Sequence, residues 1–365
     1  MKQRGSKYTV LRLVSIAVLF LIGSGAPLRA ADHCVILQYH HFSDKTPAIT
    51  SVSLEQFDAH LEYLQANDFR ILPLRDVVAA LQQKKQLPDR CVSLTVDDAY
   101  ISVYQNAFPR LRELGWPLTV FVNTEVVDRG IRSYMSWDQM RELAGHGVTF
   151  ENHGHGHIHM IRRINGETDA DWRKRIIRDI STAQRRISKE IGVAPRLFAY
   201  PYGEYNPELL EIIREMGFVG FGQQSGPVWP DADLGVLPRF PMAAGYAHMQ
   251  GFTIKVNTLP LPVISAIPVD PLVPLHVTRP ILEITLAPGA YTKSAIQCYI
   301  DGSNDVAITW SRDVTDQFTV RPNFDLGHGR HRTNCTMPSK QKGRFHWYSH
   351  NWFIRKPDGS WYTEY

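Results

Sequence analysis

The chain has 365 residues, of which 44% are apolar and 21% charged; this composition is typical of a folded globular protein and excludes a disordered or low-complexity chain. The length is comfortable for two domains. Residues 1–30 hold five of the 40 basic residues and none of the 36 acidic ones, so the rest of the chain has 35 basic residues against 36 acidic ones. The net charge of +4 therefore comes from the N-terminus, and nothing favours a nucleic-acid partner.

The N-terminus has the pattern of a secretory signal peptide. A basic start precedes an apolar run at 13–23, and small residues follow around Ala30. Because the run is short for a membrane span, we expect cleavage near Ala30, with an uncleaved anchor as the alternative. Cys34 lacks the small apolar residues that precede a lipidated cysteine. We therefore expect a signal peptide at 1–30, no stable membrane span after its removal, and an exported, periplasmic or extracellular protein.

Export to an oxidising compartment allows the four cysteines to pair. Cys34 and Cys91 each open an apolar run and lie six residues before a polar residue at the end of that run. If the two runs are neighbouring parallel strands, these cysteines lie level and can bond. Cys298 and Cys335 would then form the second pair. The alternative is four buried free thiols, and spacing alone does not decide the connectivity.

Short apolar runs alternate with helical patterns over residues 31–260. The predicted strands are 35–40, 92–96, 118–122, 196–200 and 218–222. One predicted helix begins at Ser53, where Gln56 completes a capping box, a charged helix spans about 169–190, and a third begins at Asn206-Pro207. This alternation predicts an α/β fold with a parallel sheet, open or closed into a barrel.

The pattern changes near Pro260. Residues 261–280 are rich in proline and predict an extended linker. Residues 281–365 show short apolar runs separated by turn signals, which predicts a small all-β sandwich. Half of the chain's eight tryptophans lie there: Trp310, Trp347, Trp352 and Trp361. They either stack on sugar rings or fill the core of the sandwich.

Histidines gather in the segment 151–159, Glu-Asn-His-Gly-His-Gly-His-Ile-His. His153 and His157 are four residues apart, so one helical turn or a tight loop could direct both to a metal ion. His155 and His159 are less favoured ligands, although either could replace His157 if the loop is shifted. The alternative is a solvated histidine-rich loop.

Adjacent carboxylates, Asp97 and Asp98, end the apolar strand that contains Thr95-Val96. Charges at such a position are costly unless they are compensated, and active sites are expected at the carboxyl ends of parallel strands. Because side chains alternate along a strand, one carboxylate can hold a metal while the other faces a substrate. The alternative is a pair that caps a following helix. His40 and His41 end the first strand and either line the same pocket or are structural.

A third motif, Phe-Ala-Tyr-Pro-Tyr-Gly at 198–203, follows another strand. The ordered set T-x-D-D, H-x-x-x-H and F-A-Y-P-Y-G resembles the polysaccharide deacetylases, the family-4 carbohydrate esterases with a NodB-homology domain. The segments Tyr-His-His-Phe at 39–42 and F-A-Y-P-Y-G are most similar to the branch that deacetylates poly-β-1,6-N-acetylglucosamine. The resemblance covers about residues 34–260. It implies a distorted (β/α) barrel of the NodB-homology type, followed here by the β-sandwich.

The resemblance also implies roles for single residues. Asp97 would be the general base, and Asp98, His153 and His157 would bind one divalent metal ion, zinc in the first place, with cobalt or nickel as alternatives. Bound metal makes a coordinated water far more acidic, and it polarises the acetamide carbonyl. By the same resemblance the backbone N–H of Tyr202 would stabilise the oxyanion.

Four further residues concern the substrate pocket. The resemblance implies that Tyr200 and Pro201 shape it, and His40 could line it. Many family members have an arginine at the position of Ala199; Arg239 could stand in for it, or be an ordinary loop arginine.

Two other positions depart from the family pattern. Ala99 stands where glycine is common. The Leu-x-His motif that supplies the general acid is absent, and His248 and His276 are weak substitutes.

The expected function is metal-dependent N-deacetylation of an acetylated, N-acetylglucosamine-containing polysaccharide outside the cell or in its wall. One alternative is a carbohydrate-binding or assembly protein on a weakly active or inactive deacetylase scaffold, which the missing acid motif favours. Another is an O-acetyl-ester deacetylase of the xylan type, because the same chemistry hydrolyses esters. No recognisable catalytic residue lies after residue 203, so we expect the second domain only to hold polymer.

Overall fold

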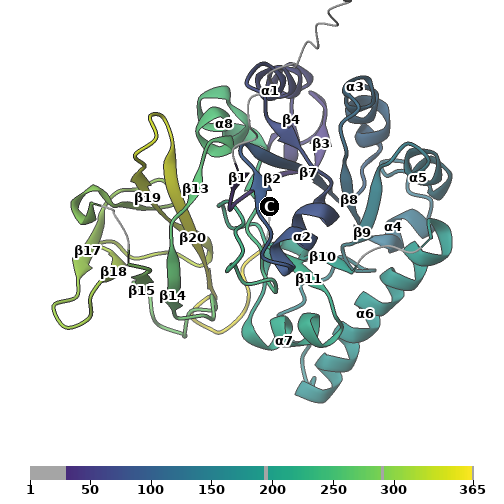
Figure 1. Cartoon of the computed structure of the whole chain (residues 1–365). Coiled ribbons are helices and arrows are strands. Elements are labelled where there is room, and N and C mark those ends of the chain that lie inside the picture. The colour runs from purple at the N-terminus through teal and green to yellow at the C-terminus, as the bar shows by residue number, and fades with distance from the viewer. Residues whose placement is uncertain (1–29, 193–195, 289–291, 364–365) are drawn as a thin grey trace, which may run out of the picture.

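The structure is a computed structural model, and it describes residues 30–192, 196–288 and 292–363. The predicted signal peptide, apart from Ala30, lies outside these residues. Within the described ranges no helix has the length and apolar character needed to cross a membrane. The chain forms a helix-covered sheet and, beside it, a smaller part built from two further sheets, one antiparallel and one mixed (Figure 1).

An eight-stranded parallel sheet forms the centre of the first part, in the order β11-β10-β9-β8-β7-β2-β12, with β5 pairing with β7 beside this path. Its strands are β2 (Val35–Tyr39), β5 (Arg70–Ile71), β7 (Cys91–Asp97), β8 (Thr119–Val122), β9 (Thr149–Asn152), β10 (Leu197–Ala199), β11 (Val219–Phe221) and β12 (Phe240–Pro241). Two short pairs flank it: β1 (Ala30–Ala31) with β6 (Leu87–Pro88), and β3 (His41–Phe42) with β4 (Ser51–Val52). The central strand β7 is buried along its whole length, as expected for a sheet that is covered on both faces.

Helices cover this sheet (Figure 1). They are α1 (Leu54–Ala66), α2 (Leu74–Gln82), α3 (Phe108–Leu114), α4 (Thr124–Asp128), α5 (Trp137–Ala144), α6 (Asp169–Glu190), α7 (Pro207–Glu215) and α8 (Met249–Val256). The predicted capping box is present, because Ser53 and Gln56 each accept a hydrogen bond from the other's backbone N–H. Asn206 is the N-cap of α7, so this helix begins at the predicted Asn206-Pro207 step. The predicted α/β architecture is therefore confirmed.

The second part consists of two four-stranded sheets, ordered β13-β20-β19-β16 and β14-β15-β18-β17. Their strands are β13 (Leu259–Pro260), β14 (Val263–Ile267), β15 (Leu282–Leu286), β16 (Gln297–Ile300), β17 (Val306–Trp310), β18 (Gln317–Pro322), β19 (Gly329–Pro338) and β20 (Phe345–Ile354). Trp352 is 2% exposed and belongs to the core between the sheets. Of the two roles considered for this tryptophan, it therefore fills the core and does not stack on a sugar ring.

One detail of the predicted boundary differs from the structure. The segment 261–280 was expected to be a linker, but β14 within it pairs with β15 as an edge strand. Pro262 and Pro268 flank β14, where their missing N–H groups interrupt no ladder between two strands. The proline content that suggested a linker is thus compatible with a sheet edge. The division of the chain into domains near residue 260 stays a prediction.

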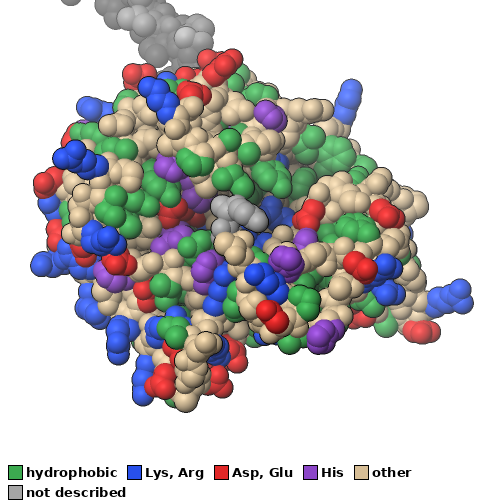
Figure 2. Space-filling view, turned by 180° about the vertical axis from the view of Figure 1, so that it is seen from behind, with side chains coloured by type: hydrophobic (Ala, Val, Ile, Leu, Met, Phe, Trp, Pro, Cys, Tyr) green, Lys and Arg blue, Asp and Glu red, His purple; other side chains and the backbone are tan. Residues whose placement is uncertain are grey.

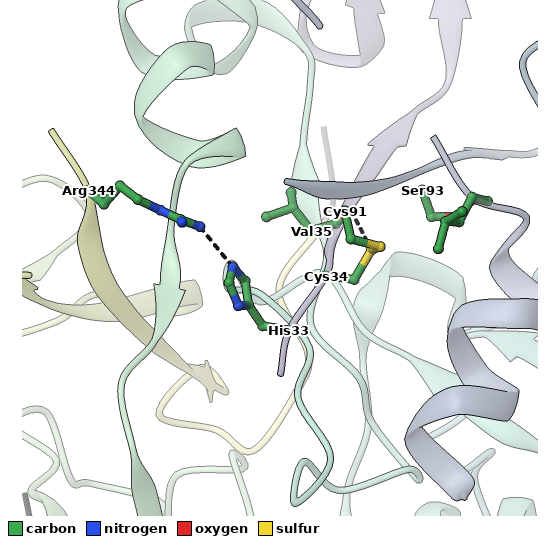
Figure 3. The surroundings of a disulfide bond; sticks show 7 residues. His33, Cys34, Val35, Cys91, Ser93 and Arg344 are labelled. Atoms are coloured by element: carbon green, nitrogen blue, oxygen red, sulfur yellow. Dashed lines mark hydrogen bonds between the residues drawn. A yellow bond between two sulfur atoms is a disulfide. The ribbon is translucent and has the colours of Figure 1, made fainter. Parts of the chain in front are cut away.

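Both predicted disulfides are present: Cys34–Cys91 and Cys298–Cys335. The first joins the starts of the neighbouring parallel strands β2 and β7, as the level position of the two cysteines predicted (Figure 3). Beside it, the His33 imidazole contacts the Arg344 guanidinium of the second part, with 3.0 Å between the nitrogens. This contact ties the second part to the first near the start of β2.

Candidate active site

The carboxyl ends of β7, β9 and β10 open into a cleft with a volume of about 670 Å³. Active sites of parallel sheets are expected at this edge. Histidine side chains surround a hollow with a recessed acidic group on the face shown in Figure 2. The residues that line the cleft come from both parts of the chain.

Asp97 is the last residue of β7, and the chain turns sharply directly after it. Asp98 and Ala99 have φ angles of 72° and 56°, in the left-handed region that non-glycine residues rarely adopt. Both carboxylates are buried, with exposed fractions of 0% for Asp97 and 7% for Asp98. The turn, and not strand alternation alone, directs the two neighbouring carboxylates to different partners.

Asp98, His153 and His157 form a cluster with the chemistry of a metal site. Asp98 Oδ1 lies 3.5 Å from His153 Nε2 and 3.4 Å from His157 Nε2. One ligand atom from each residue lies within 4.8 Å of the others. Among the described residues, this is the group of three His, Cys, Asp or Glu side chains that could hold a metal ion. Two imidazole nitrogens and one carboxylate oxygen are a donor set that suits a divalent transition metal and leaves positions open.

The two imidazoles are prepared to act as ligands. His153 Nδ1 lies 2.8 Å from the carbonyl oxygen of Ala199; when Nδ1–H donates to this carbonyl, Nε2 presents its lone pair to the cluster. Burial lowers the pKa of His157 to about 4, so its ring is neutral at neutral pH, as a metal ligand must be. The donor atoms of the cluster therefore fit a metal ion.

The histidine-rich loop is held by Asp179 of α6. Its carboxylate accepts hydrogen bonds from the backbone N–H groups of His155, at 2.8 Å, and Gly156, at 2.9 Å. Gly154 has a φ of 76°, and a Cβ there would lie 2.7 Å from Asp179 Oδ2, so the turn requires glycine. The His155 ring points to Thr124 Oγ1 at 2.8 Å, away from the cluster.

His159 also has a partner of its own. Its Nδ1 lies 2.9 Å from Glu204 Oε2, and its ring stacks on Tyr202 with 3.7 Å between the ring centroids. Of the four histidines in this segment, only His153 and His157 join the cluster with Asp98. The register suggested by the four-residue spacing is thus the one that the structure has.

Asp97 is bound by Arg239. The guanidinium donates from Nη1 to Oδ1 at 2.7 Å and from Nη2 to Oδ2 at 2.8 Å, and both side chains are fully buried. Gln38 donates a third bond to Oδ2 at 2.6 Å. Burial by itself would raise the pKa of Asp97, but the positive charge of Arg239 and its hydrogen bonds outweigh it and hold that pKa well below its ordinary value.

Arg239 binds Asp97 from a different strand region than the one that contains Ala199. Ala199 ends β10, which lies next to the edge strand β11. Arg239, which binds the Asp97 carboxylate, directly precedes β12 at the opposite end of the strand order. Arg239 is anchored by its Nε–H, which donates to the carbonyl of Gly222 at 3.0 Å. The alternative of an ordinary loop arginine is wrong, because the side chain is fully buried.

Tyr202 stands in a strained turn at the mouth of the cleft. Its φ is 59°, and Gly203 follows with a φ of 67°. Tyr202 and Gly203 line the cleft, whereas Tyr200 and Pro201 are buried and are not among the lining residues described. The Tyr200 hydroxyl donates to the carbonyl of Gly235 at 2.6 Å. This bond anchors Tyr200 beneath the turn, and the role of Tyr200 and Pro201 in shaping the substrate pocket stays a prediction.

The remaining predicted histidines divide into two groups. His40 lines the cleft, and burial lowers its pKa despite the nearby acidic groups. His41 stacks on Tyr100 at 3.6 Å between ring centroids. His248 and His276, the weak candidates for a general acid, are exposed and absent from the described lining of the cleft.

Residues of the second part also line the cleft, which was not expected from the sequence. They are Asp301, Arg330, His331, Arg332, Asn351 and Phe353. Arg330 on β19 donates a hydrogen bond to the carbonyl of Tyr202, across the boundary between the parts. The one available signal was the polar run Arg330–Arg332 inside a strand, which has no fixed spacing from the other motifs.

Comparisons with known proteins agree with the fold. Residues 84–221 match the polysaccharide deacetylase family. The chain is 28% identical over 230 residues to the poly-β-1,6-N-acetyl-D-glucosamine N-deacetylase of Staphylococcus epidermidis, covering 57% of this chain and 78% of that protein. It is similar to the solved structure of IcaB from Ammonifex degensii, with 25% identity, a TM-score of 0.53, and coverage of 60% and 94% of the two chains.

A second solved structure shows the same fold. It is the deacetylase PplD of Streptococcus pyogenes in complex with acetate, with 23% identity, a TM-score of 0.53, and coverage of 58% of this chain and 93% of that one. These two structural matches support the expected fold, a distorted (β/α) barrel of the NodB-homology type, which here is a half-barrel of parallel strands with helices. The chain therefore contains a polysaccharide deacetylase domain of the NodB-homology type, which the family match places within residues 84–221, and its relatives are hydrolases.

Proposed function

We propose that this protein is an exported, metal-dependent N-deacetylase of an N-acetylglucosamine-containing polysaccharide outside the cell or in its wall. The observation that carries the proposal is the pairing of a metal-type cluster with a separate buried carboxylate. Asp98, His153 and His157 converge, while Asp97 beside them is bound by Arg239. The named activity of the Staphylococcus epidermidis relative supports the choice of N-acetylglucosamine.

Asp98, His153 and His157 would hold a divalent ion, zinc in the first place. Such an ion, when bound, acidifies coordinated water and polarises the acetamide carbonyl. The lowered pKa of His157 matches this role, because a neutral imidazole supplies a lone pair without adding positive charge. Asn123 Nδ2 lies 3.4 Å from Asp98 Oδ1 and helps to orient that carboxylate.

Asp97 would accept the proton of the attacking water. An ionised carboxylate has about four acceptor sites, and here three are taken by Arg239 and Gln38, which leaves one for a proton. Arg239 keeps the carboxylate ionised in a buried position and fixes its plane. A general base must be ionised and must keep a constant position relative to the acetamide, and Arg239 provides both conditions for Asp97.

The turn around Tyr202 would bind the developing oxyanion through the backbone N–H of Tyr202. A preorganised backbone donor stabilises charge that appears only in the transition state. The hydrogen bond from Arg330 to the Tyr202 carbonyl, together with the stacked ring of His159, restrains this turn. For protonation of the leaving amine, the imidazoles outside the metal cluster in the described lining of the cleft are His40 and His331.

The rival of an inactive carbohydrate-binding scaffold is disfavoured by the cost of the site. A fully buried aspartate with a bidentate arginine, and three further ligand-type side chains beside it, are expensive to maintain without a function. The two disulfides fit the proposed export.

Acetate release from N-acetylglucosamine oligomers tests the proposal. The protein should release acetate when zinc, cobalt or nickel is supplied, and chelation should abolish the release. Asp97→Asn should bind metal as the wild type does and lose turnover. Acetate release that continues at the wild-type rate in this variant would remove Asp97 from the mechanism, and failure on every N-acetylated oligomer would remove the proposed function.

A further inference from the structure

Strand β19 of the second part forms one wall of the cleft. Arg330, His331 and Arg332 follow each other on this strand, and Asp301, which follows β16, lies beside them. Asp301 is already occupied. Its Oδ2 lies 2.5 Å from His331 Nδ1, and its Oδ1 accepts the backbone N–H of Arg332 at 2.9 Å. The His331 ring also reaches the carbonyl of Gly327 from Nε2, at 2.8 Å.

His331 balances the charge of Asp301. Each ring nitrogen faces an acceptor, so the imidazolium, which donates from both nitrogens, satisfies both contacts. Burial opposes this charge, but the bonds to Asp301 and Gly327 outweigh it and raise the pKa of His331. The carboxylate of Asp301 is therefore paired with His331 and not with the guanidinium of Arg332.

The Arg332 guanidinium has only neutral partners among the described residues. Nη1 donates to the Ser225 hydroxyl at 3.1 Å, and Nε contacts Asn351 Oδ1 at 3.4 Å. No carboxylate in the described part of the chain forms an ion pair with it, and no acceptor there is within hydrogen-bond distance of Nη2. Arg332 is half-buried in the cleft wall; burial lowers its pKa and the neighbouring charge of Arg330 adds to this, while Tyr246 and Asp301 act in the opposite direction.

Other arginines around the site show what is missing at Arg332. Arg239 has a bidentate carboxylate in Asp97, and Arg162 contacts Glu204 at 2.6 Å. Arg332 lines the same cleft without such a partner. A guanidinium recognises a planar carboxylate best, by two parallel N–H···O bonds.

We propose that Arg332 binds a carboxylate of the substrate, so that the acetylated polysaccharide is an acidic glycan in which a uronic-acid-type group stands near the N-acetylated sugar. This inference rests on the proposed function and narrows its substrate class. The first part of the chain would supply the hydrolytic groups, and β19 would select the polymer. The second domain thereby belongs to the active site and is more than a remote polymer holder.

A matched pair of ligands tests the inference. One is an alternating N-acetylglucosamine–glucuronate tetramer, and the other is the same tetramer with its carboxylates methyl-esterified. Binding of both to the zinc-loaded full chain is measured by calorimetry, which needs no turnover. Arg332→Gln removes the cation, and Arg321→Gln is the control, because Arg321 lies exposed on β18 and is not among the cleft-lining residues.

The wild type and R321Q should bind the acidic tetramer at least about tenfold more tightly than its ester, since hydrogen bonds to charged groups are the strong ones. In R332Q the preference should fall to near one, with the affinity for the ester unchanged. A wild type without preference, including one that binds neither tetramer, would overturn the inference. So would a preference that persists in R332Q, which would place carboxylate binding at the metal. The proposed function is tested separately, by acetate release from neutral oligomers, so that a failure of the inference and a failure of the proposed function can be told apart.

Discussion

Removal of Arg239 should destabilise the protein strongly, because it leaves the fully buried Asp97 carboxylate without its counter-charge. Both side chains have an exposed fraction of 0%, and two hydrogen bonds of 2.7 and 2.8 Å join them. Breaking a buried pair by deleting one partner costs about 3–5 kcal/mol. The Arg239→Met variant should therefore lose about this much free energy of unfolding, and its acetate release should fall because the carboxylate is no longer held in place.

The chain offers a matched control in Arg214, which contacts both oxygens of Asp233 at 2.8 and 2.6 Å. These side chains are 51% and 46% exposed, and an exposed pair contributes about 0–1 kcal/mol. Unfolding by urea, followed with chelator present in all samples, should thus separate Arg239→Met from Arg214→Met by several kcal/mol. The double variant Arg239→Met/Asp97→Asn, which removes both charges, should recover much of the loss.

The reasoning would be refuted if Arg239→Met lost no more free energy of unfolding than Arg214→Met. It would also be refuted if Asp97→Asn in the Arg239→Met background gave no recovery, because the cost would then come from lost packing and not from an unpaired charge.

Three further predictions follow from the same structure. Asp98→Ala should remain folded and lose stoichiometric zinc by elemental analysis, and full occupancy would exclude it as a ligand. Burial lowers the pKa of His60 to about 4 and of His350 to about 3. Above about pH 6.5 these two histidines are neutral in both the folded and the unfolded protein. As the pH falls below this value, they are protonated in the unfolded chain before they are in the folded protein. The free energy of unfolding should therefore fall by about 1.4 kcal/mol per pH unit for each histidine down to about pH 4. His350→Phe should reduce this slope in urea titrations, and an unchanged slope would contradict the assignment. Replacing Cys298 and Cys335 by serine should cost roughly 3–4 kcal/mol in the chain-entropy account, and equal urea midpoints would contradict it.

Local chemistry made much of the first part predictable from the sequence. The caps at Ser53 and Asn206 depend on residues within one turn, and they appear where the sequence placed them. The level position of Cys34 and Cys91 followed from strand alternation and a parallel sheet. The approach of Asp98 to His153 and His157 was implied by the resemblance of the three ordered motifs to the polysaccharide deacetylases.

Contacts between distant segments account for what the sequence did not predict. The sequence left open whether Arg239 orients Asp97 or is an ordinary loop arginine. The two residues lie 142 positions apart, and only the sheet order, which puts β12 beside β2, brings them together. Arg332 reaches the cleft because the second part packs against the first, and no periodicity within β19 encodes that packing. The strand β14 was hidden by its flanking prolines, which signal a linker locally but are tolerated at a sheet edge.

The central claim is that Asp97 works beside a metal held by Asp98, His153 and His157 to remove acetyl groups from an N-acetylated glycan. The most direct measurement is the time course of acetate release from N-acetylglucosamine oligomers before chelation, after chelation, and after zinc is added back to the same sample. The account predicts release, its loss, and its return in the wild type, with no release at any stage in Asp97→Asn. Release that is insensitive to chelation, or that persists in Asp97→Asn, would contradict it.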